Sequence, residues 1–306
     1  MLSPQARAAL KAAQGATPVH HPDFDIAADR ERARALAAEQ EKEPVAEVRD
    51  VDADGVPCRL YVPETPGSPD GLVVMAHGGG FVFHDVEVYD APARRLANRA
   101  GMAVLSVDYR RPPEHRFPAA PDDCDTASAW AAAHAADLGV EGPLFAFGDS
   151  AGANLALVTA LRNPGRFAAV ALVYPFLDPG ALALEDGVLE VRHESYRSEA
   201  HGMDAAEGEW YWQQYAAAEA DRTHPDMAPL RSDRLHALPP TLVATAEHDP
   251  LRDEGELLAA QLAELGVDVV GTRYLGQVHG FWRHHQVFPQ AEPLTRQVAG
   301  FLRSHL

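Results

Sequence analysis

Residues 148–152 read Gly148-Asp149-Ser150-Ala151-Gly152 and could carry out nucleophilic chemistry. An apolar run of strand length, 144–147, precedes them, and helix formers follow from Ala151 onward. A strand that reverses sharply into a helix holds the central serine at a strained, exposed apex. The flanking glycines lack a Cβ, so the two chain segments can pass close together. The pattern predicts a nucleophilic Ser150, and a tight turn around a buried serine is the alternative interpretation.

A serine hydroxyl is a poor nucleophile at neutral pH and needs an adjacent base. Two polar loops follow later strand-like runs, in the chain order serine, acid, histidine. Asp249 comes shortly after the run 241–245, and His279 comes shortly after the run 267–275. Because the carboxyl ends of parallel strands meet at one edge of a sheet, we predict that Asp249 and His279 serve Ser150 as acid and base.

Neighbouring residues compete for these two roles. Glu247 belongs to the strand end and Asp253 to the following helix, so both are weaker candidates for the acid. His284 and His285 lie beyond the loop, where we expect the solvated start of a helix. The 15 histidines show no His-Glu-x-x-His or comparable ligand spacing, so we predict neither a metal site nor a cofactor.

A glycine-rich segment, His77-Gly78-Gly79-Gly80-Phe81, follows directly after the apolar run 72–76. Acyl transfer passes through a tetrahedral oxyanion, which preorganised N–H donors must stabilise. Glycines allow backbone angles that aim such donors into a site. A phosphate-binding loop is disfavoured because neither Gly-x-Gly-x-x-Gly nor Gly-Lys-Ser/Thr occurs, and a plain glycine turn is the remaining alternative.

The elements that must position these residues alternate along the chain. Residues 45–62 predict a β-hairpin with a turn at 53–55. Buried strands are then predicted at 72–76, 102–107, 144–147, 168–174, 241–245 and 267–275, with helices between most of them. This alternation predicts an α/β fold with a mostly parallel central sheet flanked by helices.

Two segments lie outside this alternation. Residues 1–43 contain two helical pieces separated near Pro18 and Pro22, with a disordered arm as the alternative. Residues 179–230 contain no buried-strand run and are too long for an ordinary connection, so they predict an inserted lid. We therefore divide the chain into N-terminal cap helices, 1–43, and a catalytic domain, 44–306, that carries the insertion.

Composition restricts the possible partners. The 306 residues, 46% of them hydrophobic, suit one large α/β domain with insertions or two small domains. The net charge of −19 argues against nucleic acid or an anionic membrane as a partner. The lysines are Lys11 and Lys42 alone, as expected from a GC-rich coding bias or from salt adaptation. Cys58 and Cys124 make no disulfide framework, and residues 1–14 contain no signal peptide, so we expect a cytoplasmic protein.

Many separate motifs, in the same order, resemble the hormone-sensitive-lipase-like branch of the α/β-hydrolases, whose bacterial members are carboxylesterases. They are His77-Gly78-Gly79-Gly80, Asp108-Tyr109-Arg110, Pro113-Glu114-His115, Phe117-Pro118-Ala119-Ala120, Asp122-Asp123, Gly148-Asp149-Ser150-Ala151-Gly152 and Asp249-Pro250-Leu251-Arg252-Asp253-Glu254-Gly255. The resemblance covers about residues 45–306. Ala153 stands where the family usually has glycine, and Pro112 stands where it usually has alanine.

The resemblance implies roles for particular residues. Ser150, Asp249 and His279 match the nucleophile, acid and base, and the oxyanion-hole amides match Gly79, Gly80 and Ala151. It also implies a cap built from the N-terminal helices and the insertion. The candidates for the substrate pocket are His77, Phe81, Asp149, Trp210 and Tyr211. Trp210, Tyr211, Trp212 and Tyr215 recur at helical spacing, so a role in the core is the alternative for these aromatics.

We therefore expect a carboxylic-ester hydrolase for small esters with short to medium acyl chains, acting through a covalent acyl-enzyme. A binding protein of the same fold that resembles the plant hormone receptors, and an amidase or thioesterase, are the alternatives. The sequence leaves a homodimer open.

Overall fold

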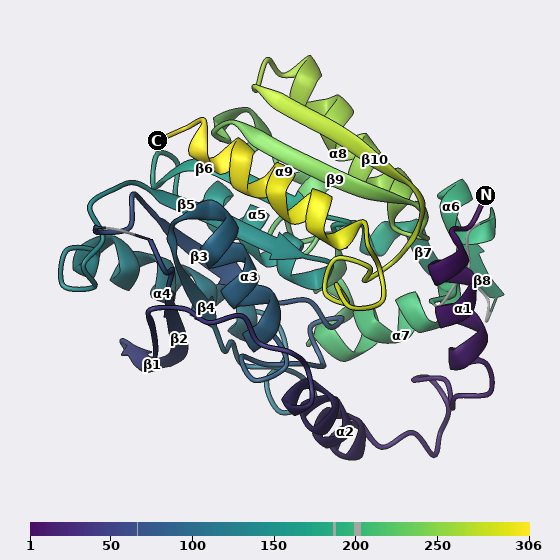
Figure 1. Cartoon of the computed structure of the whole chain (residues 1–306). Helices are drawn as coiled ribbons and strands as arrows, with labels where there is room; N and C mark the ends of the chain where they lie inside the picture. Colours follow the sequence, from purple (N-terminus) through teal and green to yellow (C-terminus); the bar gives the residue numbers. More distant parts are fainter. Residues whose placement is uncertain (66, 186–187, 199–202) are drawn as a thin grey trace.

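The computed structural model describes residues 1–65, 67–185, 188–198 and 203–306 (Figure 1). Within this part of the chain, one eight-stranded sheet has the order β1-β2-β4-β3-β5-β6-β9-β10. Its strands are β1 (Glu47–Ala53), β2 (Val56–Val62), β3 (Leu72–Ala76), β4 (Ala103–Val107), β5 (Leu144–Asp149), β6 (Phe167–Val173), β9 (Thr241–His248) and β10 (Val269–Val278). The β1–β2 and β2–β4 pairs are antiparallel, and the remaining neighbours are parallel.

The central strands are buried on both faces because side chains alternate between two hydrophobic cores. In β3, Val73 and Met75 belong to one core, whereas Val74 and Ala76 belong to the other. Successive strand residues point to opposite faces of a sheet. A strand covered on both sides therefore reads as a continuous apolar run, as 72–76 does in the sequence.

Helices cover both faces of the sheet. The helices α3 (Asp90–Ala100) and α9 (Ala291–Arg303) contribute to the core that holds Val73. The helices α4 (Ala119–His134), α5 (Ala151–Arg162) and α8 (Arg252–Glu264) contribute to the opposite core. Figure 1 shows α3 and α9 lying over the same face of the sheet. The predicted α/β architecture is confirmed.

The remaining elements come from the two segments that lie outside the alternation. The helices α1 (Pro4–Ala13) and α2 (Ile26–Ala38) precede the sheet, and α6 (Glu194–Ser198) and α7 (Ala205–Tyr215) lie between β6 and β9. The two segments meet where Phe24 packs edge-on against Trp210, with ring centroids 6.4 Å apart. The α2 residue Arg30 also donates to the Val82 carbonyl at 2.9 Å, which ties α2 to the glycine-rich loop region. Figure 1 shows α2 and α7 on the same side of the molecule.

The structure corrects two expectations about residues outside the central sheet. The insertion contains a short hairpin, β7 (Leu182–Glu185) and β8 (Val188–Val191), although no strand was expected there. A strand of four residues offers too few alternating positions to be recognised from its pattern. His284 and His285 lie in the irregular segment before α9 rather than at a helix start.

The strands that lead to the predicted acid and base also extend further than expected, to His248 and Val278. Residues 186–187 and 199–202 of the predicted insertion lie outside the described residues. The division into cap and catalytic domain stays a prediction. In the part of the chain that the structure describes, the helices lack the combined length and apolar character needed to cross a membrane.

Candidate active site

Ser150 lies at a sharp reversal between β5 and α5. Its backbone adopts φ +56° and ψ −124°, and a positive φ is unusual for a residue with a Cβ. The reversal brings the chain so close to itself that a Cβ on Gly148 would overlap the Gly152 carbonyl. A Cβ on Gly152 would overlap the Ala76 carbonyl of β3. The two glycines therefore allow the close approach that holds Ser150 in place.

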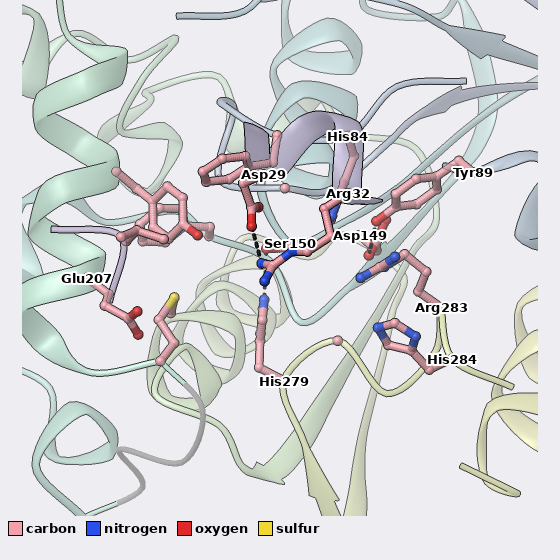
Figure 2. Close-up of a pocket in the computed structure, with 18 of the residues that line it drawn as sticks. Asp29, Arg32, His84, Tyr89, Asp149, Ser150, Glu207, His279, Arg283 and His284 are labelled. Atoms are coloured by element: carbon pink, nitrogen blue, oxygen red, sulfur yellow. Dashed lines mark hydrogen bonds and ion pairs between the residues drawn. The ribbon is translucent and has the colours of Figure 1, made fainter. Parts of the chain in front are cut away.

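His279 and Asp249 complete a hydrogen-bonded chain with this serine. The His279 Nε2 lies 2.9 Å from Ser150 Oγ (Figure 2). The Nδ1 of the same ring lies 2.8 Å from Asp249 Oδ2. Asp249 follows β9 and is fully buried, and its Oδ1 accepts the Leu251 N–H at 2.8 Å. Because the ionised carboxylate can only accept, Nδ1 carries the proton and Nε2 is free to accept from the serine hydroxyl.

Electrostatics around His279 favour a base that functions near neutral pH. Burial is the largest influence and lowers the pKa of His279, but the charge and hydrogen bond of Asp249 raise it. The net effect is a pKa above the usual 6.5. A nearby carboxylate thus compensates for the loss of water around the imidazole.

The competing acids make other contacts. Glu247 accepts the Gly276 N–H at 2.7 Å, and Asp253 accepts the Ser195 N–H at 2.8 Å. In the described part of the chain, no hydrogen bond or ion pair joins either of them to His279. The structure therefore brings Asp249, and neither rival, to the imidazole.

The glycine-rich loop lies beside Ser150. Gly79 and Gly80 line the same cavity as Ser150 and have φ +121° and +58°. A Cβ on Gly80 would overlap the Tyr211 ring, and one on Gly79 would overlap the Phe83 carbonyl. Both positions therefore require glycine, for space as well as for backbone angle.

Asp149 joins the loop to the serine turn. Its carboxylate accepts the Gly78 N–H at 3.1 Å and the Tyr89 hydroxyl at 3.0 Å. The Tyr174 hydroxyl donates to the same carboxylate at 3.2 Å. Burial raises the pKa of Asp149 despite these bonds. Asp149 lines the cavity, as does Tyr211, and its contacts hold the loop against the serine turn.

The other three residues expected in the pocket do not line the cavity. His77 is fully buried and stacks on Tyr109 with ring centroids 4.2 Å apart, and burial lowers its pKa to about 3. Phe81 is also buried and stacks on Tyr215 at 3.8 Å. Trp210 stacks on Phe83 at 6.1 Å instead. These expectations are corrected, because all three side chains serve packing beneath or beside the loop.

The cavity encloses about 340 Å³ and contains residues that the sequence did not indicate. They are Thr17, Val19, Phe24, Asp29, Arg32, Phe83, His84, Tyr89, Phe176, Met203, Glu207, Gly280, Arg283 and His284. Several come from the N-terminal segment and carry no motif. His84 lies four residues from Gly80, and Arg283 lies four residues from His279, so proximity in the chain was the available signal. The His84 Nδ1 donates to the Gly78 carbonyl at 3.2 Å.

A mostly parallel sheet, a serine at a strand-to-helix reversal and a histidine–aspartate pair beyond later strands define a serine hydrolase of the α/β type. A family model described as the alpha/beta hydrolase fold matches residues 73–283. The chain belongs to this family, in its hormone-sensitive-lipase-like branch of carboxylesterases.

The similarity to individual proteins extends over nearly the whole chain. An arylesterase of Saccharolobus solfataricus is 34% identical over 289 residues, which cover 92% of each chain. An ethyl acetate hydrolase of Pseudomonas putida is 32% identical and covers 94% of this chain and 92% of its own. The solved structure of a hyperthermophilic esterase from Pyrobaculum calidifontis matches with a TM-score of 0.88 at 36% identity, covering 99% of this chain and 98% of that one.

Proposed function

We propose that this carboxylesterase cleaves its substrates with Ser150 as nucleophile, His279 as general base and Asp249 as the acid that orients the base. As Ser150 Oγ attacks the ester carbonyl carbon, its proton passes to His279 Nε2. The tetrahedral intermediate collapses when the same nitrogen returns the proton to the departing alcohol oxygen. Water then attacks the acyl carbon while His279 takes its proton. The bond from that carbon to Ser150 Oγ breaks, the proton passes from His279 to Oγ, and the carboxylic acid leaves. The observation that carries this proposal is the hydrogen-bonded chain Ser150–His279–Asp249.

The oxyanion of both tetrahedral intermediates binds, in this proposal, to the N–H groups of Gly79, Gly80 and Ala151. Among the described residues, no hydrogen bond uses the N–H of Gly79 or Gly80. Ala151 is the first residue of α5, so its N–H has no acceptor within the helix. Three donors are thus free beside Ser150, and the positive end of α5 adds to their effect.

The preferred substrates, in this proposal, are esters whose acyl group is short to medium in length. The cavity of about 340 Å³ is partly closed by Phe24 from the N-terminal segment and by Met203 and Tyr211 from the insertion. We take these two segments to be the cap. Each added methylene gains about 0.8 kcal/mol, or roughly fourfold in kcat/KM, only while the cavity can bury it. The chain's charge of −19 also opposes approach to anionic lipid.

A series of p-nitrophenyl esters from acetate to palmitate tests this proposal. We expect kcat/KM to rise over the short chains, to pass through a maximum and then to fall. Emulsions of long-chain triglyceride should give slow turnover, with no jump in rate above the solubility limit. A steady rise through palmitate would refute the enclosed pocket and indicate a true lipase.

The receptor-like alternative predicts no turnover in the same assay. A burst of p-nitrophenol from the acetate ester, followed by steady release, is the result that we expect of an acyl-enzyme. An amidase or thioesterase would instead prefer the matched amide or thioester. A cytoplasmic location and a homodimer remain predictions.

A further inference from the structure

Arg283 lines the active-site cavity, where the Asp149 carboxylate interacts with it electrostatically but does not pair with it directly. It follows the predicted base by four residues and is half-buried. In the part of the chain that the structure describes, its guanidinium makes no hydrogen bond or ion pair, and it lies over the Tyr89 ring, 6.0 Å from Cζ to the centroid. Figure 2 shows the side chain reaching toward Tyr89 and Asp149. A half-buried guanidinium whose N–H groups make no hydrogen bond is unfavourable unless a ligand or water satisfies them.

The arginines of nearby elements differ from Arg283 in this respect. Arg30 of α2 pairs with Glu114 at 2.8 Å, and Arg34 pairs with Asp85 at 2.6 Å. Arg32, which also lines the cavity, pairs with Asp29 one turn away (Figure 2). The chain has 45 acidic residues against 26 basic ones, so carboxylates outnumber the cations with which they could pair. The unpaired state of Arg283 is therefore a feature of its position.

The carboxylates that line the cavity are already engaged. Asp29 holds Arg32, and Glu207 accepts the backbone N–H of Asp204 at 3.2 Å. Arg283 points toward Asp149 in Figure 2 and interacts with it electrostatically, but the loop amide and two tyrosine hydroxyls described above occupy the Asp149 oxygens. The five N–H donors of Arg283 are therefore available to a ligand.

The two histidines near Arg283, His84 and His284, carry no positive charge of their own. The charge of Arg283, followed by burial, lowers the pKa of His284 to about 3. Burial, followed by the charge of Arg283, lowers the pKa of His84 well below 6.5. Both imidazoles are thus neutral at physiological pH. Arg283 is the local cation that an anionic group entering this side of the cavity would meet.

We infer that Arg283 forms an anion subsite, and that this esterase favours small esters that carry a carboxylate elsewhere in the molecule. The inference rests on the proposed function, because the ester group must reach Ser150 while the carboxylate reaches Arg283. The planar guanidinium fork binds a carboxylate through two parallel hydrogen bonds. Half-esters of short dicarboxylic acids carry the carboxylate on the acyl side, and acetylated hydroxy acids carry it on the alcohol side.

Two isosteric pairs of esters test the inference. Monoethyl glutarate is compared with ethyl glutaramate by ethanol release, and 4-acetoxybutanoate with 4-acetoxybutanamide by acetate release. Within each pair a carboxylate is replaced by a neutral amide of the same size. We expect the wild-type enzyme to favour the carboxylate in at least one pair, although the net charge of −19 opposes anions.

The preference is measured as the kcat/KM of the carboxylate ester divided by that of its amide partner. Arg283→Gln should lower this ratio about 10- to 100-fold, the effect of losing charge-assisted hydrogen bonds to a carboxylate. The ratio cancels any loss of activity that both esters share. Arg283→Lys, which keeps the charge without the fork, should retain part of the preference. Arg296→Gln is the matched control, because Arg296 is exposed on α9 and pairs with Glu292; its ratio should equal that of the wild type.

The possible outcomes separate this inference from the proposed function. Hydrolysis of the neutral esters with the same ratio in wild type and Arg283→Gln would overturn the anion subsite alone. A wild-type preference for the amide in both pairs would also overturn it. Loss of all four activities, together with that on p-nitrophenyl butyrate, would overturn ester hydrolysis itself.

Discussion

The assignment of Asp249 as the acid makes a sharp prediction for Asp249→Asn. In the native site, Oδ1 accepts the Leu251 N–H and Oδ2 accepts from His279 Nδ1, both at 2.8 Å. Asparagine has one side-chain oxygen. If that oxygen keeps the Leu251 bond, the amide NH₂ faces Nδ1, which must then give up its proton. The proton moves to Nε2, and His279 can no longer accept from Ser150.

The size of the effect follows from these contacts. The imidazolium that forms during the reaction loses its hydrogen bond to the charged Asp249 carboxylate, worth about 1.5–3 kcal/mol. Restoring the active tautomer also leaves a buried donor without an acceptor, at a cost of about 1–3 kcal/mol, because Asp249 is fully buried. The total of about 2.5–6 kcal/mol corresponds to a loss of roughly 10²- to 10⁴-fold in kcat.

The assay is steady-state hydrolysis of p-nitrophenyl butyrate, with thermal unfolding followed by circular dichroism to check the fold. The matched control is Asp253→Asn, since Asp253 contacts Ser195 and Arg252 but not the imidazole. We expect the control to lose less than about tenfold in kcat. If Asp253→Asn caused the larger loss and Asp249→Asn stayed within tenfold of wild type, Asp249 would not be the acid that orients His279.

The other predictions concern the remaining parts of the site. Ser150→Ala should lower kcat by about 10⁴-fold or more while leaving the unfolding temperature nearly unchanged, and near-wild-type turnover would contradict the mechanism. A pH profile of kcat/KM should fall on the acid side as His279 gains a proton, with an apparent pKa above 6.5 because Asp249 raises it. Asp249→Asn removes that charge, so the acid limb of its residual activity should move to lower pH. Gly80→Ala should lower kcat by about 10²-fold, since φ +58° and the Tyr211 ring leave no room for a Cβ beside a proposed oxyanion donor. Activity of Gly80→Ala equal to that of the wild type would remove Gly80 from the oxyanion hole.

The features that the sequence determined by itself are local ones. Strands buried on both faces appear as apolar runs, so β3 was predicted with its observed bounds, 72–76. The turn around Ser150 depends on neighbours within five residues, because the glycines that permit it lie on either side. The chain order of Ser150, Asp249 and His279 likewise needed no coordinates, since parallel strands end at one edge of the sheet.

The tertiary structure alone decided which side chains face the cavity. Ser150 and His279 are 129 residues apart, and their contact depends on the packing of the whole sheet. His77 and Phe81 flank the glycines of the loop, yet their rings pack into the interior against Tyr109 and Tyr215. Arg283 reaches the cavity because of the course of the loop after β10, which no local sequence pattern predicts. A side chain's direction is set by the distant segments that pack around it, and these become neighbours only when the chain is folded.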